Sequence, residues 1–430
     1  MYRIFEPSYK YISRIKIIDE YFCFKKAIDT NLYGLNHLIS NSINNKNMNA
    51  KERFNRALNH QKTDRLPVTT HHILDSFMDK YMPGKDVQDF FDEFKLDPIC
   101  WISATKPNKG EYYDPTQGKL GFLETARICS DNWRFETITL DGYNFPTKRL
   151  NIITQDKTLS MVLQSNIHTS WISERLIKEK NDIDIISKYI TSPLCDVDAI
   201  NKAAADFGNR GMVRGSMLFF DGLGQPGCWQ DAACLFGIQE LIMATFEDSD
   251  WVHTFLKILM EHKLPYVRSM KGANYDLIDH GGGDASTTVI SPDIFDDFVA
   301  PYDEPLVVAA HEAGQKVVYH TCGGMMPILE NIADMKVDAM ETFTPEGMGG
   351  DTILAEAKRR IGAKVCMIGG FDQFHFFTGC TEKETRAEVR RCFEETGEGG
   401  GFILSPSDHF FDADFNLIKA FSDEARKCIY

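Results

Sequence analysis

The sequence lacks the segments that carry a chain into or through a membrane. No stretch approaches the roughly 18 consecutive apolar residues of a membrane-spanning helix. The first residues also lack the compact apolar core and small-residue cleavage site of a secretory signal. The eleven cysteines are an odd number and are scattered, with no C-x-x-C pair. This distribution favours reduced thiols over a disulfide framework, so we expect a cytoplasmic protein that does not bind membranes.

Positive charge is also scarce. The 47 Lys and Arg residues against 62 Asp and Glu residues give a formal net charge of −15. Such a field repels phosphates, so nucleic acid is not an expected partner. No G-x-G-x-x-G motif opens a helix after the first strand, which leaves a dinucleotide-binding fold without support.

The chain changes character near Met48. Residues 1–47 are rich in Ile, Asn, Lys, Tyr and Phe but show no sustained helical or strand period. Met48-Asn-Ala-Lys-Glu-Arg-Phe then predicts an amphipathic helix that Asn49 can cap. We therefore expect residues 1–47 to be a poorly structured extension upstream of a natural start at Met48. A genuine mobile arm is the alternative. Residues 48–430 are expected to form the folded domain.

Two strand patterns follow. From about residue 105 to 195, short alternating segments separated by turn residues predict an antiparallel insertion in the N-terminal half. In the C-terminal half, continuous apolar strands alternate with helices, which is typical of a parallel sheet buried on both faces. The predicted strands span about 212–220, 275–280, 316–324, 337–343, 364–372 and 401–409. We predict an α/β fold, a (β/α)8 TIM-type barrel.

Polar or reactive side chains end almost every late strand, and active sites of such barrels lie at the carboxyl ends of the strands. These residues are Asp284, His320, Cys322, Glu341, Asp372, Asp408 and His409. Gly281-Gly-Gly-Asp284 and Gly369-Gly-Phe-Asp372 place a carboxylate after flexible backbone. Such glycines either let a ligand approach the chain or simply form tight turns.

His320-Thr-Cys322 is the sharpest chemical signal. Residues i and i+2 of a strand face the same side, so an imidazole and a thiolate share one site, as two zinc ligands do. Further ligands would come from Asp408 or His409. Glu341, Asp372 and Asp284 are weaker candidates, as catalytic groups, substrate contacts or groups that orient the ligands. The alternative is that Cys322 packs in the core and His320 bonds to backbone.

Three other groups carry weaker signals. His71 and His72 follow the early strand Leu66-Pro-Val-Thr-Thr and could reach the same mouth, although surface histidines are the more common outcome. Arg65 and Arg214 could bind a carboxylate. Cys366 has apolar neighbours and is expected in the core.

With these motifs, residues 48–430 resemble the uroporphyrinogen decarboxylase-like barrels. This superfamily includes zinc-dependent methyltransferases that act on methylated corrinoid proteins. The resemblance rests on Met48-Asn-Ala-Lys-Glu-Arg-Phe through Thr63-Asp-Arg-Leu-Pro-Val, Ile290-Ser-Pro-Asp through Pro301-Tyr, His320-Thr-Cys-Gly, Gly369-Gly-Phe-Asp and Gly400-Gly-Phe-Ile-Leu-Ser-Pro-Ser-Asp-His.

The resemblance implies two possible activities. Decarboxylases of the superfamily hold substrate carboxylates with arginines in a Met-Arg-Gln-Ala-Gly-Arg-Tyr stretch. The corresponding Val68-Thr-Thr-His-His-Ile-Leu-Asp-Ser-Phe has no arginine. The methyltransferases use a His-x-Cys pair and a distant cysteine as zinc ligands. His320 and Cys322 match the pair, but Asp408 lies where the distant cysteine is expected, so Asp408 or His409 would have to replace it.

The resemblance therefore favours zinc-assisted methyl transfer between a small-molecule methyl donor or acceptor and a corrinoid cofactor on a partner protein. A metal-free decarboxylase and a non-catalytic barrel subunit remain as alternatives.

Overall fold

A computed structural model describes residues 48–116, 127–218, 220 and 226–430. The predicted extension, residues 1–47, lies outside the described residues. Asn49–Tyr430 forms one compact unit. None of the described helices is both long enough and apolar enough to span a bilayer.

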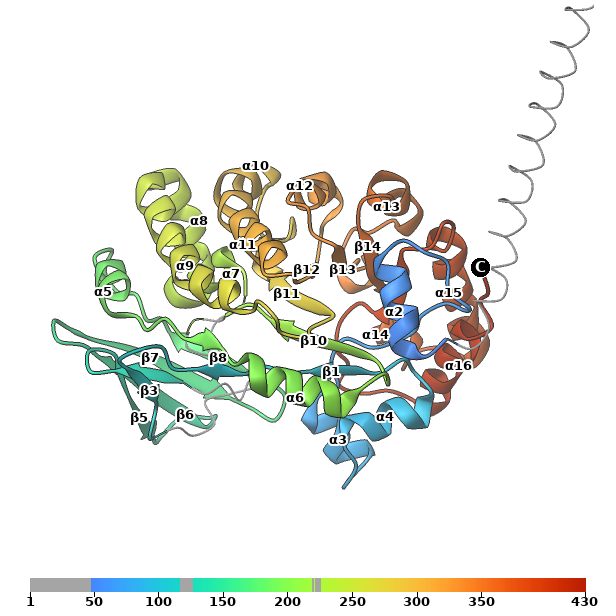
Figure 1. The fold of residues 1–430 in the computed structure, drawn as a ribbon, viewed down its shortest axis with the longest axis horizontal. Coiled ribbons are helices and arrows are strands. Elements are labelled where there is room, and N and C mark those ends of the chain that lie inside the picture. The colour runs from blue at the N-terminus through green and yellow to red at the C-terminus, as the bar shows by residue number, and fades with distance from the viewer. Residues whose placement is uncertain (1–47, 117–126, 219, 221–225) are drawn as a thin grey trace, which may run out of the picture. The chain divides into compact units, whose positions relative to one another are not determined.

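A parallel sheet forms the centre of this unit. Its seven strands pair in the order β1-β10-β11-β12-β13-β14-β15, all parallel. They are β1 (Ile99–Trp101), β10 (Met212–Ser216), β11 (Leu277–Gly281), β12 (Val317–His320), β13 (Ala339–Thr342), β14 (Cys366–Phe371) and β15 (Phe402–Pro406). Figure 1 shows the late strands on a curved path, with helices on the outer side. The strands are buried along most of their length, as expected for a parallel sheet covered on both faces.

A short eighth segment lies between the first and last strands of the sheet. Val68 forms a parallel bridge with Leu404 of β15, and the Thr69 amide donates to the Leu404 carbonyl at 2.9 Å. On the other side, the Asp97 amide, just before β1, donates to the Val68 carbonyl at 2.7 Å. These bonds connect β15 to the start of β1, and the predicted (β/α)8-type barrel is confirmed.

Helices connect the strands and cover them. They are α2 (Ala50–Leu58), α3 (Asp75–Tyr81), α4 (Val87–Phe94), α5 (Asp182–Tyr189), α6 (Val197–Phe207), α7 (Cys228–Phe236), α8 (Ile238–Glu247), α9 (Ser249–Ser269), α10 (Pro292–Ile294), α11 (Ala300–Glu312), α12 (Leu329–Asp334), α13 (Leu354–Ile361), α14 (Gln373–Phe376), α15 (Glu382–Thr396) and α16 (Phe415–Ala425). A π-helical turn, Phe295–Val299, joins α10 to α11.

Helix starts follow local sequence signals. Asn49 and Glu52 form a capping box on α2, and Thr381 and Glu384 form another on α15. Ser291 accepts a hydrogen bond from the third residue of the turn that opens α10, with proline at the first position.

The predicted antiparallel insertion is also confirmed. It is a four-stranded sheet of β5 (Arg134–Leu140), β6 (Thr147–Ile153), β7 (Thr158–Ser165) and β8 (Ser170–Glu174), paired in chain order. One face carries Phe135, Leu150, Ile152, Leu159 and Met161, all buried. Two smaller antiparallel pairs accompany it, β2 (Thr105–Lys106) with β9 (Leu194–Cys195), and β3 (Glu111–Tyr113) with β4 (Ile128–Ser130).

Candidate metal and active site

Strand register brings five polar side chains to the interior at the carboxyl ends of the central strands. His320 of β12 is the register partner of Glu341 on β13. Arg214 and Ser216 alternate along β10, and Ser216 is the partner of Asp279 on β11. Side chains of register partners in a parallel sheet share one face. These strands therefore present their polar residues to one shared region.

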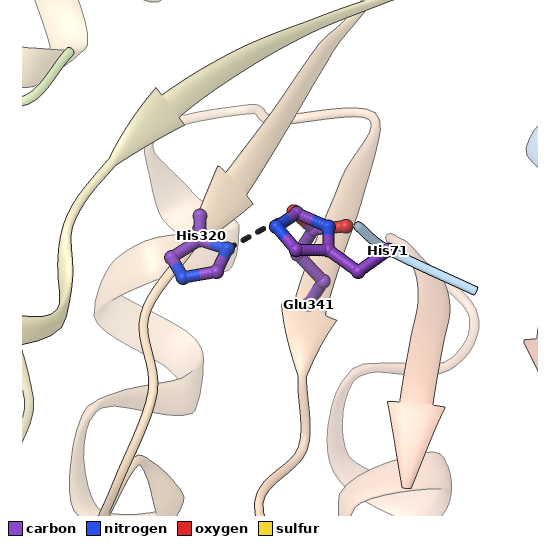
Figure 2. Close-up of side chains that lie close together, drawn as sticks. All are labelled: His71, His320 and Glu341. Atoms are coloured by element: carbon purple, nitrogen blue, oxygen red, sulfur yellow. Dashed lines mark hydrogen bonds and ion pairs between the residues drawn. The ribbon is translucent and has the colours of Figure 1, made fainter. Parts of the chain in front are cut away.

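Three potential ligand atoms converge there. One atom each from His71, His320 and Glu341 lies within 4.8 Å of the other two, the only such group of His, Cys, Asp or Glu in the part of the chain that the structure describes. Nδ1 of His320 lies 3.1 Å from Oε1 of Glu341, and Nδ1 of His71 lies 3.3 Å from the same oxygen. Figure 2 shows the two imidazoles beside the Glu341 carboxylate, and their ring centroids are 5.0 Å apart in a stacked arrangement.

Glu341 is a buried charge held by an arginine. Both terminal nitrogens of Arg214 donate to the two Glu341 oxygens at 3.0 Å each. Burial alone would raise the pKa of the Glu341 carboxyl, but Arg214 and the two histidines hold that pKa well below its usual range. The carboxylate is therefore ionised, and its oxygens interact with Arg214 and with the two imidazoles.

His320 combines two partners. Burial opposes its charged form, but the Cys322 side chain and Glu341 raise its pKa well above the usual value. Cys322 lies against the loop after β11, because a Cβ on Gly283 would meet the Cys322 sulfur at 2.7 Å. The glycines of this loop thus make room for protein groups. At Gly283 the space is taken by the Cys322 side chain, which neither of the two interpretations of these glycines had predicted.

An aromatic wall lies beside the triad. His72 stacks on the Trp101 ring at 4.7 Å between centroids, and the Arg214 guanidinium lies 4.3 Å from the same ring. The Trp101 indole N–H donates to the His71 carbonyl at 3.2 Å, which fixes the backbone that carries both histidines. Burial, and then the neighbouring charges of His71 and Arg214, keep the pKa of His72 well below its usual value. His72 is therefore a neutral ring.

Asp279 and Ser216 line the same end of the barrel with atoms that form no hydrogen bond. The Asp279 side chain is 15% exposed and lies 3.8 Å from Arg214. Its Oδ1 and the Ser216 hydroxyl, both buried, have no hydrogen-bond partner among the described residues. Burial and the charge of Glu341 raise the pKa of the Asp279 carboxyl.

The remaining predicted residues lie at strand ends but have partners of their own. Asp284 accepts from the Gln230 amide at 2.8 Å, and burial raises its pKa. Asp372 caps α14 by accepting from the His375 amide. Asp408 and His409 pair with each other at 2.8 Å. Burial would raise the pKa of Asp408, but His409 and, more weakly, the charge of His320 lower it.

Two sequence interpretations change. His71 is not a surface histidine: it is buried in the triad, because the segment before it is the eighth strand of the barrel. Arg214, a weak candidate by sequence, is the central cation of the site, whereas Arg65 binds Asp97 near the amino ends of the strands. Trp101 was not predicted as a site residue, because its strand β1 has only three residues and so shows no recognisable alternation. Cys366 is buried, as expected.

The donor atoms fit a zinc ion. Arg214 occupies both oxygens of Glu341, so this carboxylate serves better as a partner of His320 than as a metal ligand. An Nδ1–H that donates to Glu341 leaves Nε2 of His320 as a ligand atom, the usual carboxylate–histidine–metal arrangement. Cys322 interacts with the same imidazole and would supply a sulfur. Imidazole and thiolate are characteristic zinc ligands. The four predicted ligands, His320, Cys322, Asp408 and His409, remain a prediction as a set.

Known proteins share this fold and part of this sequence. Residues 226–428 match the family model described as uroporphyrinogen decarboxylase (URO-D). Uroporphyrinogen decarboxylase of Neisseria meningitidis serogroup C is 30% identical over 122 residues, 27% of this chain and 32% of that protein. Methylcobamide:CoM methyltransferase MtaA of Methanosarcina barkeri is 26% identical over 176 residues, 41% of this chain and 48% of that protein.

These alignments span a third to a half of the length of the curated relatives. A solved structure covers more of the chain. The methyltransferase from Methanosarcina mazei aligns with 89% of this chain and 99% of its own, with a TM-score of 0.57 and 15% identity. At that identity the likeness shows a common fold.

Proposed function

We propose that the chain, whose residues 226–428 match the uroporphyrinogen decarboxylase (URO-D) family model, is a zinc-dependent methyltransferase of that family. It would move a methyl group between a small substrate and a corrinoid carried by a partner protein. One observation carries the proposal: His320 is oriented by an ionised carboxylate and stands beside a cysteine thiol at the carboxyl ends of the strands. The 26% identity to methylcobamide:CoM methyltransferase MtaA supports this choice within the family.

Each residue has a defined task in this proposal. His320 and Cys322 would hold zinc, with Asp408 or His409 as a further ligand. Glu341 fixes the His320 ring and its tautomer, and Arg214 keeps Glu341 ionised in the interior. When bound, zinc acts as a Lewis acid on the group that gives or accepts the methyl. Asp284 and Asp372 are proposed as outer groups that shape the site.

The second candidate is a metal-free decarboxylase, favoured by the 30% identity to uroporphyrinogen decarboxylase. A porphyrinogen carries many carboxylates, and arginines are the usual partners of such groups. Both terminal nitrogens of Arg214 donate to Glu341, so Arg214 cannot bind the substrate carboxylates unless it breaks these bonds. This engagement favours the methyltransferase. A barrel that only binds a partner is the third candidate.

Metal analysis and two assays distinguish the three candidates. We expect about one zinc per chain in protein purified without chelator, and its loss in His320→Ala and Cys322→Ala. Turnover of methylated corrinoid should fall at least about a thousandfold in both variants, since Lewis-acid stabilisation is worth several kcal/mol. Cys366→Ala is a matched control, because Cys366 is a buried cysteine of the core.

Chelator-insensitive decarboxylation of uroporphyrinogen would establish the second candidate instead. Full zinc occupancy in Cys322→Ala would show that the ligand assignment is wrong. A protein that binds corrinoid protein but turns over neither substrate would be the non-catalytic subunit.

A further inference from the structure

His72 is a polar side chain of the site to which the proposed function gives no task. It follows His71 on the segment after residues 67–69, which close the barrel, and the two rings lie edge to face at 4.2 Å between centroids. His71 in turn stacks on His320 at 5.0 Å. The three imidazoles therefore lie one beside the next, and a single ring separates His72 from the proposed zinc ligand His320.

Ring contacts hold the His72 side chain in place. It stacks on Trp101, whose ring centroid lies 4.7 Å away with an angle of 25° between the two planes. The Trp101 indole N–H donates to the His71 carbonyl, so the ring that supports His72 is bonded to the backbone beside it. An imidazole held between two aromatic partners has little freedom to turn. The nitrogens of His72 therefore keep a fixed direction.

The two ring nitrogens of His72 are available to a ligand. Neither forms a hydrogen bond with any residue that the structure describes, and neither is among the fully buried atoms, because His72 is only half-buried. A neutral imidazole has one N–H donor and one lone pair that accepts. In this respect His72 differs from Arg214 and Glu341, which donate to and accept from each other.

The surroundings of His72 favour a neutral group on the ligand. Burial is the largest cause that lowers the pKa of His72, and the charges of His71 and Arg214 come next. Burial opposes a full charge of either sign on a bound molecule, as it does on the ring itself. The positive charges of His71 and Arg214 also oppose an ammonium group. The ring stays neutral and keeps its lone pair, which suits a neutral hydrogen-bond donor.

We propose that His72 determines substrate specificity by accepting a hydrogen bond from the neutral hydroxyl or thiol group of the small substrate. This role rests on the proposed function, because the oxygen or sulfur of such a group is the atom that carries the methyl in the methylated form. The same atom has lone pairs for a Lewis acid. Once methylated, it has no hydrogen to donate. His72 therefore favours the unmethylated form of the small molecule over the methylated form.

Pairs of isomers test this role by equilibrium binding, without turnover. Ethanethiol and dimethyl sulfide have the same composition, as do ethanol and dimethyl ether, but only the first member of each pair has a hydrogen to donate. Ligand-observed NMR on the full chain, as purified and after chelator treatment, measures both pairs with and without metal, and acetate is the anionic probe. The quantity compared is the ratio of the two affinities within a pair.

His72→Phe keeps a ring against Trp101 but removes both nitrogens. It should lower the preference for the hydrogen-donating isomer about threefold to tenfold in at least one pair, the effect of one hydrogen bond. His72→Gln retains an acceptor oxygen and should keep part of the preference, and it also covers the case in which His72→Phe does not fold. His311→Phe is the matched control, since His311 is exposed and pairs with Asp338 just before β13. It should show the wild-type ratios.

Equal ratios in wild type, His72→Phe and His72→Gln would overturn this role of His72, as would binding of acetate that is tighter than both pairs and lost in His72→Phe. Zinc content separates the result from the proposed function. His72→Phe should retain zinc, because His72 is not a proposed ligand. If methyl transfer requires zinc but the ratios do not depend on His72, the role of His72 fails and the proposed function stands. If chelated protein shows ratios that depend on His72 and no methyl transfer occurs, the recognition by His72 stands and the proposed function fails.

Discussion

At the scale of single residues, Arg214 controls the chemistry of the site through Glu341. A carboxylate buried in a protein interior would normally take up a proton. The bidentate guanidinium keeps Glu341 ionised, and Glu341 in turn favours the protonated form of His320. Ionised Glu341 stabilises the folded protein at pH values above its unfolded pKa of about 4.3. This contribution is lost as the pH falls through the lower pKa that Glu341 has in the folded protein. Protonated His320 stabilises the folded protein at pH values below its unfolded pKa of about 6.5. This contribution is lost as the pH rises through the higher pKa that His320 has in the folded protein.

This coupling predicts a pH-dependent zinc affinity. A zinc ligand must be a neutral imidazole, so zinc has to displace a proton from His320 wherever pH lies below its raised pKa. We expect zinc affinity to rise by about tenfold per pH unit for each proton released. The measurement is calorimetry of zinc binding in two buffers of different ionisation enthalpy, which counts the protons.

The variant Glu341→Gln tests the cause of this pH dependence. Without the carboxylate, the pKa of His320 should fall, and the protein should release fewer protons on binding zinc. Zinc affinity itself should fall about tenfold to a hundredfold, as losses of outer-shell partners do. Asp293→Asn, an exposed carboxylate on α10, should leave both quantities unchanged. A zinc affinity independent of pH in the wild type would show that His320 is not the proton-releasing ligand.

The sequence predicts one half of this site better than the other. His320 and Cys322 could be recognised because i and i+2 on a strand share a face, whatever lies around them. His71 and Arg214 reach His320 and Glu341 only through the closed barrel, across separations of hundreds of residues. Their shared partner, Glu341, was one of several acidic residues predicted at strand ends. The sequence alone does not show which of these carboxylates each histidine or arginine contacts.

At the scale of elements, the barrel depends on a very short strand. Pro67–Thr69 bonds to β15 on one side and to the start of β1 on the other. Asp97 holds this junction on the β1 side. It accepts from Arg53 at 2.6 Å, from both terminal nitrogens of Arg65, and from the Val68 amide at 3.0 Å. The long apolar strands were predictable from their pattern, whereas this junction depends on one buried carboxylate.

We therefore predict that Asp97→Ala lowers the free energy of unfolding by about 3–5 kcal/mol. The substitution leaves the buried Arg53 and the half-buried Arg65 without this counter-charge and the Val68 amide without an acceptor. Urea denaturation at neutral pH gives the value. Thr381→Ala, which removes the N-cap of α15, should cost about 1 kcal/mol and serves as the reference. A smaller loss for Asp97→Ala than for Thr381→Ala would mean that the junction does not depend on Asp97.

At the scale of the whole molecule, Asn49–Tyr430 contains everything that its own core requires. Most buried apolar side chains of barrel and insertion belong to one continuous cluster that runs from Phe54 to Cys428, and a small second cluster holds Ala204, Phe207 and Val213. The first helix, α2, is capped from within this unit, because Asn49 accepts from the Glu52 amide and Glu52 accepts from the Asn49 amide. The cap of this first helix therefore comes from residues of the same unit.

The last prediction follows from this self-sufficiency. A chain that begins at Met48 should have the same free energy of unfolding as the 430-residue chain, within the roughly 0.5 kcal/mol of neutral surface changes. It should also bind the same amount of zinc, because His320 and Cys322 lie far along the chain in the barrel. Urea denaturation and metal analysis of the two proteins, side by side, give both comparisons. A chain that begins at Lys51 is the informative contrast. It lacks the Asn49 side chain and should lose about 1 kcal/mol, since the capping box on α2 is broken. Two losses in the free energy of unfolding are compared: from the 430-residue chain to the chain beginning at Met48, and from that chain to the one beginning at Lys51. If the first loss is the larger, residues 1–47 contribute to the fold and the start at Met48 is wrong.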